Sequence, residues 1–362
     1  MAATSSSTST HPSTWPHVIS TLCGFPFPHL EDCSQEIVPG PEATEDPDLV
    51  RLPNGTTFWL RRRLVNSRFG AVFHGIEGIW PNPNDTATFF APRRKEEQIN
   101  VAVKMSSLEK MATLPQENSF KEISVMRHLM REGGHQHIMP VISACMSSTH
   151  LFVVTPFYMG GDLLRWVEPN TGTGEGRARR WFLQILQALA YIHQQGLCHH
   201  DVSPENVVIT NHGEAAVVMD FGMVQRLQAH PNGQVVPVRD QNAFGKLSYM
   251  APEIWENREY DGRSADIWSV AVSLLVCLVG EEQWMAPTRV PLESREIYSS
   301  DIIGYATLEQ HGAEVMLQWK NYTARMSLAA ADLLCQMLVV DRVNRPYSAA
   351  HLAQHPFFSA HP

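Results

Sequence analysis

His199-His200-Asp201-Val202-Ser203-Pro204-Glu205-Asn206, followed by the apolar run Val207-Val208-Ile209, is the stretch that decides the fold of this chain. Its aspartate, Asp201, can accept a proton from a hydroxyl group. Five residues later, Asn206 offers an amide oxygen to a divalent metal ion. The apolar run predicts a short strand directly behind them. A base and a metal ligand at this spacing, ahead of a strand, form an arrangement suited to phosphoryl transfer.

A second acidic residue, Asp220, follows Asp201 by 19 positions. The predicted strand 215–219 ends in Asp220-Phe221-Gly222. Together, the two stretches resemble the catalytic loop, H-R-D-L-x-x-x-N, and the D-F-G tripeptide of eukaryotic protein kinases of the Ser/Thr type. The resemblance implies that Asp201 is the catalytic base and that Asn206 and Asp220 bind Mg²⁺.

A lysine near the start of the chain completes the resemblance. Val101-Ala102-Val103-Lys104 matches the family's V-A-I-K, in which the lysine contacts the ATP phosphates and is held by a glutamate of the next helix. Glu122 lies 18 positions further on, in a segment whose apolar residues recur at helical spacing, and is the preferred partner. Glu117 is the rival partner. A lysine that ends a strand can also simply extend to water.

The nucleotide site is expected to be degenerate at its phosphate cover. Kinases carry G-x-G-x-x-G-x-V here, but only the third glycine, Gly70, remains, because Val65 and Ser67 occupy the first two positions. The cover should therefore be stiffer and fit the phosphates more loosely. Residues 155–159 resemble the hinge between two lobes. The resemblance implies a nucleotide site made of Leu64, Val65, Gly70, Val72, Ala102, Lys104, Thr155, Pro156, Tyr158 and Val208.

The activation segment, 220–253, departs from the family in its chemistry. Residues 221–247 contain no Ser, Thr or Tyr, so phosphorylation there is chemically unavailable. His200 agrees with this, because it replaces the arginine that grips a loop phosphate. Ser203 replaces the lysine of Ser/Thr kinases, and Lys246 replaces a threonine. Lys246 is therefore predicted to supply the missing catalytic cation from the activation segment. The alternative is a solvated lysine beside a weakened site.

The predicted fold is α+β and bilobal, like that of a protein kinase. Residues 1–54 form an acidic extension rich in Ser, Thr and Pro, predicted to be disordered. The kinase-like domain then comprises an N-lobe (about 55–154), a hinge (155–159) and a helical C-lobe (160–361).

Within this frame, two short strands are expected at 138–144 and 151–155, a flexible linker at 171–176 and a long helix at 177–195. The apolar run Ile267–Val279 is too short to span a bilayer and predicts a buried helix. Glu253 is expected to form a buried ion pair with Arg345.

Composition excludes several classes of protein. The net charge is −9, of which residues 1–50 carry −7 because they contain seven acidic residues and no Lys or Arg. No basic stripe indicates nucleic-acid binding. The six cysteines lack CxxC spacing, which favours reduced thiols over a zinc site or a disulfide framework. The chain start shows no secretory signal. A cytoplasmic protein without a membrane partner is expected, with the nucleus not excluded; the oligomeric state is open.

The sequence thus predicts a kinase that transfers the γ-phosphate of ATP, with Mg²⁺, to Ser or Thr hydroxyls of protein substrates. The alternative is a pseudokinase, a nucleotide-binding scaffold with little turnover, because two glycines and one lysine of the family are missing. Asp162 and Glu205 lie where some family members read basic residues of the substrate, which weakly suggests a preference for basic sequences.

Overall fold

The computed structural model describes residues 31–32, 37–38, 49–52, 56–79, 98–113, 119–210, 212–228, 230–231, 235–238, 246–280 and 299–359. The chain divides into two compact units. The N-terminal unit comprises residues 1–132 and 139–157, and the C-terminal unit comprises residues 133–138 and 158–362. The division after Phe157 falls inside the predicted hinge.

The short segment 133–138 belongs to the C-terminal unit, although the sequence placed it within the N-lobe. Its backbone explains the difference. The Val218 N–H donates a hydrogen bond to the His137 carbonyl at 2.9 Å, and Ile138 forms an isolated parallel bridge with Val218. These bonds attach the segment to a strand of the second unit.

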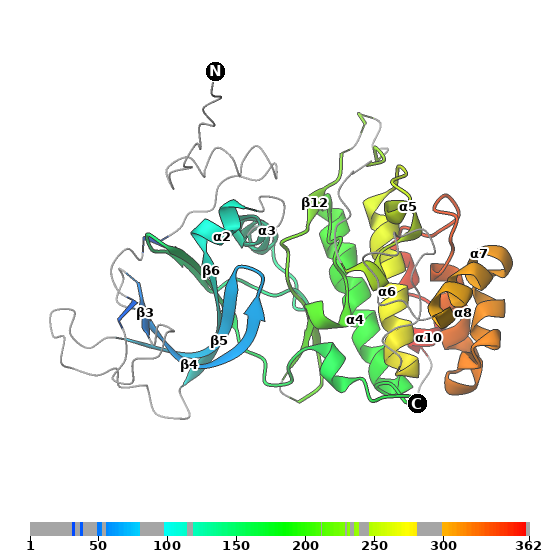
Figure 1. Cartoon of the computed structure of the whole chain (residues 1–362), viewed down its shortest axis with the longest axis horizontal. Coiled ribbons are helices and arrows are strands. Elements are labelled where there is room, and N and C mark those ends of the chain that lie inside the picture. The colour runs from blue at the N-terminus through cyan, green and yellow to red at the C-terminus, as the bar shows by residue number, and fades with distance from the viewer. Residues whose placement is uncertain are drawn as a thin grey trace, which may run out of the picture. The chain divides into compact units, whose positions relative to one another are not determined.

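The described part of the N-terminal unit is built on an eight-stranded sheet in the order β1-β7-β8-β6-β5-β4-β3-β2 (Figure 1). The strands are β1 Glu31–Asp32, β2 Ile37–Val38, β3 Leu49–Arg51, β4 Thr56–Ser67, β5 Gly70–Ile79, β6 Ile99–Ser107, β7 Ser143–Met146 and β8 His150–Pro156. Neighbours are antiparallel, apart from the parallel pair β1 and β7. Helices α2 Leu108–Ala112 and α3 Ser119–Arg131 follow β6.

Alternation along the central strands gives the sheet two different faces. In β6, Val101 and Val103 are fully buried, whereas Ala102 and Lys104, which alternate with them, are partly exposed. Successive residues of a strand point to opposite faces, so the second pair shares the face away from the core. The core face is made of Val50, Leu52, Phe58, Leu60, Ala71, Phe73, Val101, Val103, Met105, Cys145, Phe152 and Val154.

The sheet begins earlier than the predicted domain boundary at residue 55. Strand β3 pairs with β4 in the register Leu49↔Trp59, Val50↔Phe58, and Val50 and Leu52 are 1% and 3% exposed in the core. The boundary is therefore corrected to include residues 49–52. Burial of this alternating apolar pair offsets the entropy of ordering the segment. Apart from β1 and β2, the rest of the predicted disordered extension lies outside the described residues.

The sheet must curl. Strands β1 and β2 lie at opposite ends of the strand order, yet only residues 33–36 separate them along the chain. In a flat sheet, the seven spacings between them would amount to roughly 34 Å. The chain from Asp32 to Ile37 spans at most about 18 Å. The two edges of the sheet therefore approach each other.

The described part of the C-terminal unit is mainly helical. Its α-helices are α4 Glu175–Gln194, α5 Pro252–Trp255, α6 Gly262–Val279, α7 Ser299–Trp319, α8 Leu328–Met337, α9 Ala349–Leu352 and α10 Pro356–Ser359, and its short 3-10 helices are η3 Leu163–Trp166, η4 Pro204–Asn206, η5 Leu247–Tyr249 and η7 Tyr322–Arg325. Strand β10 Val207–Ile209 pairs with β11 Ala216–Val218, and β9 Leu197–Cys198 pairs with β12 Gln225–Arg226, both antiparallel. Helices α4 and α6 lie side by side (Figure 1).

Helix α6 is the buried helix predicted from the apolar run at 267–279. The Asp261 side chain caps its start by accepting from the Arg263 N–H, and Gly280, with a left-handed φ of 73°, ends it. Among the described residues, α6 is the one helix long and apolar enough to cross a membrane, and 94% of that span is buried inside the protein. It forms the centre of this unit.

Two local predictions differ from the structure. The expected strand at 138–144 is shifted, because β7 begins only at Ser143. The expected linker 171–176 packs against the end of α6, where the Thr173 N–H donates to the Cys277 carbonyl at 2.7 Å. A Cβ at Gly172, whose φ is +68°, would lie 2.1 Å from the same oxygen. This glycine allows a close backbone approach rather than flexibility.

Candidate active site

The lysine of β6 is paired within the N-terminal unit. Lys104 Nζ lies 2.7 Å from Glu122 Oε2 of α3, and the two side chains are 23% and 9% exposed. Glu122 faces the protein because it lies on the buried side of α3, together with Ile123, Val125 and Met126. The rival partner Glu117 lies outside the described residues. An ammonium fixed by a carboxylate at the edge of a core can be held ready for an anionic ligand.

Three predicted nucleotide-binding residues of the N-terminal unit share the face of Lys104. Val72 pairs with Lys104 across β5 and β6, and Ala102 pairs with Thr155 across β6 and β8. All four are partly exposed, while their sequence neighbours Ala71, Val103 and Val154 are buried. These side chains form a small, mostly apolar surface with one cation.

Other predicted nucleotide residues occupy more exposed or structural positions. Val65 is 56% exposed on β4 and pairs with Val72, and Leu64 beside it is partly exposed. A Cβ at Gly70 would lie 2.1 Å from the Met105 carbonyl, so packing between strands already requires this glycine. Pro156 ends β8 opposite Val101.

In the C-terminal unit, the β10–β11 hairpin brings the two predicted metal ligands together. Asn206 directly precedes β10, and Asp220 follows β11 by two residues. Since the strands are antiparallel in the register Val207↔Val218, the two residues emerge at the same end, where the Met219 N–H donates to the Asn206 carbonyl at 2.9 Å. The partly exposed Val208 lies on this hairpin between buried neighbours. Tyr158, half-buried, opens the unit, and its carbonyl accepts from the Gly161 N–H.

Asp201 is held by a set of hydrogen bonds. Asn206 Nδ2 donates to the Asp201 carbonyl and to Asp201 Oδ2, both at 2.7 Å, and the Lys246 N–H donates to Oδ1 at 2.9 Å. Burial raises the pKa of Asp201 above its usual value, the charges of Lys246 and His199 oppose that shift, and the charge of Asp220 adds to it. These hydrogen bonds fix the orientation of the Asp201 carboxylate, which lies beside Asn206 and Lys246 of the predicted site.

The donor set fits a hard divalent cation. Because Nδ2 of Asn206 is bound to Asp201, its Oδ1 is the acceptor end. Lys246 Nζ reaches this oxygen only at 3.4 Å, so a lone pair remains for a metal ion. Together with the carboxylate of Asp220, which contributes to the electrostatics at Asp201, it offers oxygen ligands only. Oxygen-only sets suit Mg²⁺.

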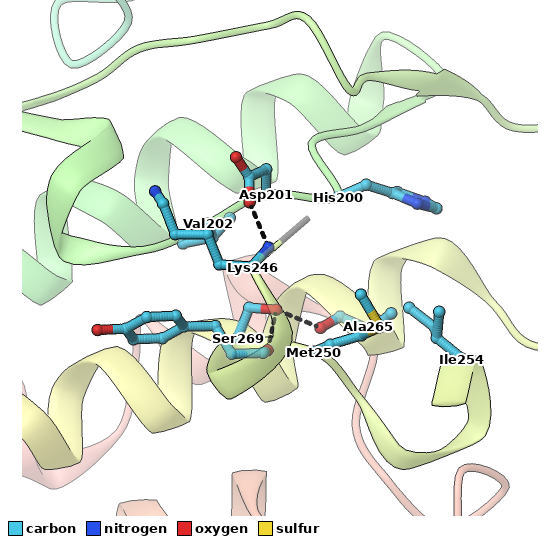
Figure 2. A pocket seen from close by; sticks show the side chains of 9 residues that line it. His200, Asp201, Val202, Lys246, Met250, Ile254, Ala265 and Ser269 are labelled. Carbon is cyan, nitrogen blue, oxygen red and sulfur yellow. Dashed lines mark hydrogen bonds between the residues drawn. The ribbon is translucent and has the colours of Figure 1, made fainter. Parts of the chain in front are cut away.

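Lys246 contacts the same group of residues. Its Nζ lies 2.7 Å from Ser203 Oγ, 3.4 Å from Asn206 Oδ1 and 3.5 Å from Glu205 Oε1. Figure 2 shows the Lys246 backbone bonded to Asp201. The structure thereby brings together Asp201, Asn206, Ser203 and Lys246.

Comparison with known proteins decides the family. The family model described as protein kinase domain matches residues 85–358. The chain belongs to the protein kinase family.

Relatives of this kinase chain include Ser/Thr kinases. It is 34% identical over 233 residues to CBL-interacting serine/threonine-protein kinase 7 of Arabidopsis thaliana, covering 63% of this chain and 52% of that protein. It is 36% identical over 162 residues to CBL-interacting protein kinase 4 of Oryza sativa subsp. japonica (44% and 34%), and 29% over 188 residues to Serine/threonine-protein kinase grp of Drosophila melanogaster (52% and 35%). The chain spans about half the length of these relatives or less.

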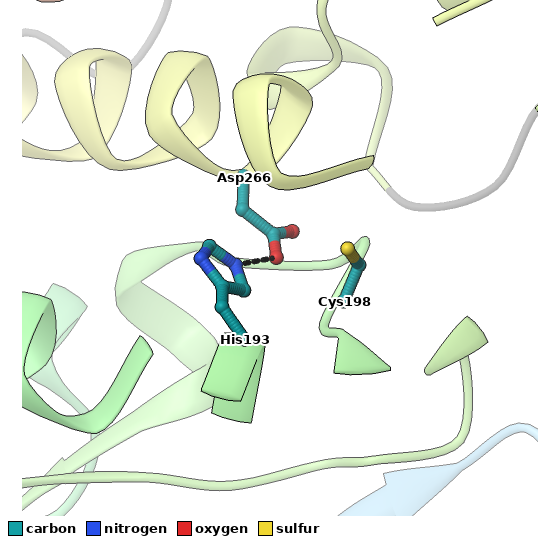
Figure 3. Close-up of side chains that lie close together, drawn as sticks. All are labelled: His193, Cys198 and Asp266. Atoms are coloured by element: carbon teal, nitrogen blue, oxygen red, sulfur yellow. Dashed lines mark hydrogen bonds and ion pairs between the residues drawn. The ribbon is translucent and has the colours of Figure 1, made fainter. Parts of the chain in front are cut away.

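Asp266 of α6, which the sequence did not mark as a site residue, anchors the 199–206 loop. Asp266 Oδ2 accepts from the His199 N–H at 2.9 Å and Oδ1 from the His200 N–H at 2.8 Å. His193 Nε2 of α4 lies 2.8 Å from Oδ2 (Figure 3). The signal available in the sequence was an acidic residue directly before the apolar run 267–279.

The Asp266 cluster is structural rather than a metal site. The ligand atoms of His193, Cys198 and Asp266 lie within 4.8 Å of one another. However, both Asp266 oxygens already accept hydrogen bonds, and burial together with the charge of Asp266 raises the pKa of Cys198 well above its usual value. A metal needs the thiolate, so this environment favours the hydrogen-bonded loop anchor.

His200 does not occupy the role of the family's arginine. It is 7% exposed, has a φ of +64°, and packs against Tyr260 with ring centroids 5.7 Å apart. A Cβ at Gly262 would lie 2.6 Å from His200 Nε2 and 2.8 Å from Cys198 Sγ, so this glycine makes room for both. Figure 2 shows the imidazole turned away from Asp201.

A small cavity lies beside Asp201, the predicted base. It is lined by His200, Asp201, Val202, Lys246, Tyr249, Met250, Ile254, Ala265 and Ser269 (Figure 2). Its volume of about 10 Å³ is enough for roughly one water molecule. A substrate side chain would therefore need the wall to move.

The predicted Glu253–Arg345 ion pair is confirmed. Arg345 Nη1 and Nη2 lie 2.6 and 3.0 Å from the two carboxylate oxygens of Glu253, and both side chains are 0% exposed. The guanidinium also donates through Nε to the Val339 carbonyl at 2.7 Å and stacks over the Trp268 ring. The pair ties the end of the activation segment to the late part of the chain.

Proposed function

We propose that this chain is an ATP-dependent protein Ser/Thr kinase that uses Mg²⁺. Asp201 orients the acceptor hydroxyl and takes its proton, while Asn206 and Asp220 hold the metal. Lys104, positioned by Glu122, contacts the phosphates of ATP. Mg²⁺ would neutralise the charge that develops on the transferred phosphoryl group.

One observation carries the proposal. Asn206 Nδ2 donates to Asp201 Oδ2 at 2.7 Å, and Asp220 follows the adjacent β10–β11 hairpin by two residues. A base and oxygen ligands arranged in this way fit phosphoryl transfer, in which catalysis depends mainly on positioning and electrostatics. The Ser/Thr kinases among the relatives support the same class of acceptor.

The preference for basic substrates, which rests on Asp162 and Glu205, stays part of the proposal. Asp162 Oδ2 lies 3.1 Å from Arg165 Nε, whose side chain is 69% exposed, and Glu205 Oε1 lies 3.5 Å from Lys246 Nζ. Ion pairs this exposed or this long compensate the carboxylate charges only weakly. The proposed acceptor is a Ser or Thr hydroxyl, with a weak preference for neighbouring basic residues.

The test is transfer of label from [γ-³²P]ATP to a generic protein acceptor, with phosphoamino-acid analysis. The purified chain should label Ser and Thr in the presence of Mg²⁺ and not after EDTA. Asp201→Asn should lower transfer by about 10²-fold or more, because it removes the base. The matched control Glu214→Gln, an exposed carboxylate in the turn of the same hairpin, should transfer normally. Equal transfer by wild type and Asp201→Asn would refute the proposal.

A second candidate is a nucleotide-binding scaffold without turnover. The observation in its favour is that the phosphate cover retains only Gly70, which packing already requires, and that Val65 is 56% exposed. In that case, Mg-ATP would raise the melting temperature by mass action. No transfer above the Asp201→Asn background would be detected.

A further inference from the structure

We propose that Lys246 is the residue that supplies positive charge to the phosphoryl group, so that the catalytic cation of this protein is carried by the activation segment. The inference rests on the proposed function and deepens it by assigning a role to one side chain.

The position of the Lys246 ammonium group supports this role. Lys246 Nζ is oriented by the hydroxyl of Ser203 at 2.7 Å and lies 3.4 Å from Oδ1 of the predicted metal ligand Asn206. The nearest carboxylate oxygen, on Glu205, is 3.5 Å away, and the Lys246 and Glu205 side chains are 37% and 31% exposed. A pair this loose and exposed neutralises the lysine only weakly. The charge therefore remains available to an incoming anion.

The backbone of Lys246 also contacts the proposed site. The Lys246 N–H donates to Asp201 Oδ1 at 2.9 Å. One residue thus fixes the proposed base through its backbone and places a cation beside the metal ligand through its side chain. A lysine that were merely solvated would need neither contact.

The loop 199–206 has no strong cation of its own. Residues 199–206 contain Asp201 and Glu205 but no Lys or Arg. The transferred phosphoryl group is itself negative, and donors and cations placed where this charge develops stabilise the transition state. Lys246 is the cation that the described C-terminal unit brings within hydrogen-bond distance of Ser203 and Asn206.

The geometry also predicts that the two positions can exchange. Ser203 is fully buried, and its Oγ touches the ammonium of Lys246. A lysine built at 203 would start beside that ammonium and compete for the same space. Ser203→Lys alone should therefore place two cations together, whereas Ser203→Lys with Lys246→Thr should leave one.

The consequence for regulation follows directly. If the activation segment moves away, the site loses both the Lys246 ammonium and the hydrogen bond from the Lys246 N–H to Asp201. Correct placement of the segment would then control turnover without a phosphorylated residue.

The experiment measures kcat and KM for ATP and for an acceptor peptide in the wild type, Lys246→Thr, Lys246→Arg, Ser203→Lys and the Ser203→Lys/Lys246→Thr double variant. Lys246→Thr keeps the backbone bond and should lower kcat by about 10²-fold, with little change in either KM. Lys246→Arg keeps the charge and should retain most of kcat, and the double variant should recover at least roughly tenfold over Lys246→Thr. Thermal unfolding should be unchanged, and Lys110→Thr, at an exposed lysine of α2, is the control.

Three outcomes would overturn the inference. They are a kcat of Lys246→Thr within threefold of the wild type, a loss confined to the peptide KM, and equal inactivity of Lys246→Thr and the double variant. If the wild type itself shows no transfer that depends on Asp201, the proposed function fails and this inference fails with it. If the wild type transfers phosphate and Lys246→Thr transfers equally well, only this inference fails.

Discussion

The ion pair between Glu253 and Arg345 allows a quantitative test of what holds the C-terminal unit together. Arg345→Met removes the charge and both hydrogen bonds to the carboxylate while keeping an unbranched apolar chain in place of the arginine stem. It leaves the Glu253 carboxylate buried without its cation, which costs about 3–5 kcal/mol. The lost bond to Val339 and the lost stacking on Trp268 place the expected cost toward the upper end.

The assay is differential scanning calorimetry or a thermal melt followed by circular dichroism. At about 2–4 °C per kcal/mol for a unit of this size, Arg345→Met should lower the melting temperature by roughly 6–20 °C. The matched control is Arg165→Met, which breaks an Arg–Asp pair of 3.1 Å whose arginine is 69% exposed. That pair should contribute below about 1 kcal/mol.

A double variant separates charge from shape. Glu253→Leu with Arg345→Met replaces the buried ion pair by apolar side chains and should regain much of the stability lost in Arg345→Met. Equal melting temperatures for Arg345→Met and Arg165→Met would refute the reasoning, because the cost would then not depend on burial.

Three further predictions concern the catalytic machinery. Lys104→Met should lower phosphoryl transfer by about 10²-fold with a small change in melting temperature. It should also weaken the binding of Mg-ATP, which calorimetry measures without any acceptor substrate. Normal binding and transfer would contradict the role of the Lys104–Glu122 pair. Asp266→Asn should lower stability at neutral pH and flatten the fall of stability in acid, and parallel pH curves would count against the anchor. Burial opposes ionisation of Asp266, but His193 of α4, together with His200 and His199 of the loop, outweighs burial and lowers the pKa of Asp266. The contribution of Asp266 is therefore present above the unfolded pKa of about 4 and disappears as the pH falls through the folded pKa. Intact-mass analysis of the active chain should find no phosphate within 221–247, which contains no hydroxyl side chain, and a phosphate there would contradict the assignment of the activation segment.

The resemblance to protein kinases implied much of the candidate site, and local patterns refined it. The resemblance implied a glutamate partner for Lys104, and helical spacing favoured Glu122 over Glu117, because Val125 and Met126 fix which face of α3 is buried. The resemblance also implied that Asn206 and Asp220 lie together, and the two predicted strands beside them pair as the β10–β11 hairpin.

Other features depend on tertiary contacts that no local pattern encodes. The bonds from Asp266 to the His199 and His200 backbone connect elements 66 and 67 residues apart. Strand β3 was missed because its few apolar residues follow a Pro-rich, acidic stretch, and only pairing with β4 buries them. The sequence predicts a flexible linker at Gly172, but the role of this glycine is a close approach to the backbone of Cys277.

The central claim is that Asp201 acts as a base within a working phosphoryl-transfer site. The most direct measurement is a single turnover with the chain in excess over [γ-³²P]ATP, quenched in time, with the labelled residue identified by mass spectrometry. The wild type should deliver label to a Ser or Thr of the acceptor, and Asp201→Asn should bind Mg-ATP equally well yet deliver at least about 10²-fold more slowly. Unchanged delivery in Asp201→Asn, or tight Mg-ATP binding by the wild type with no delivery at all, would contradict the claim.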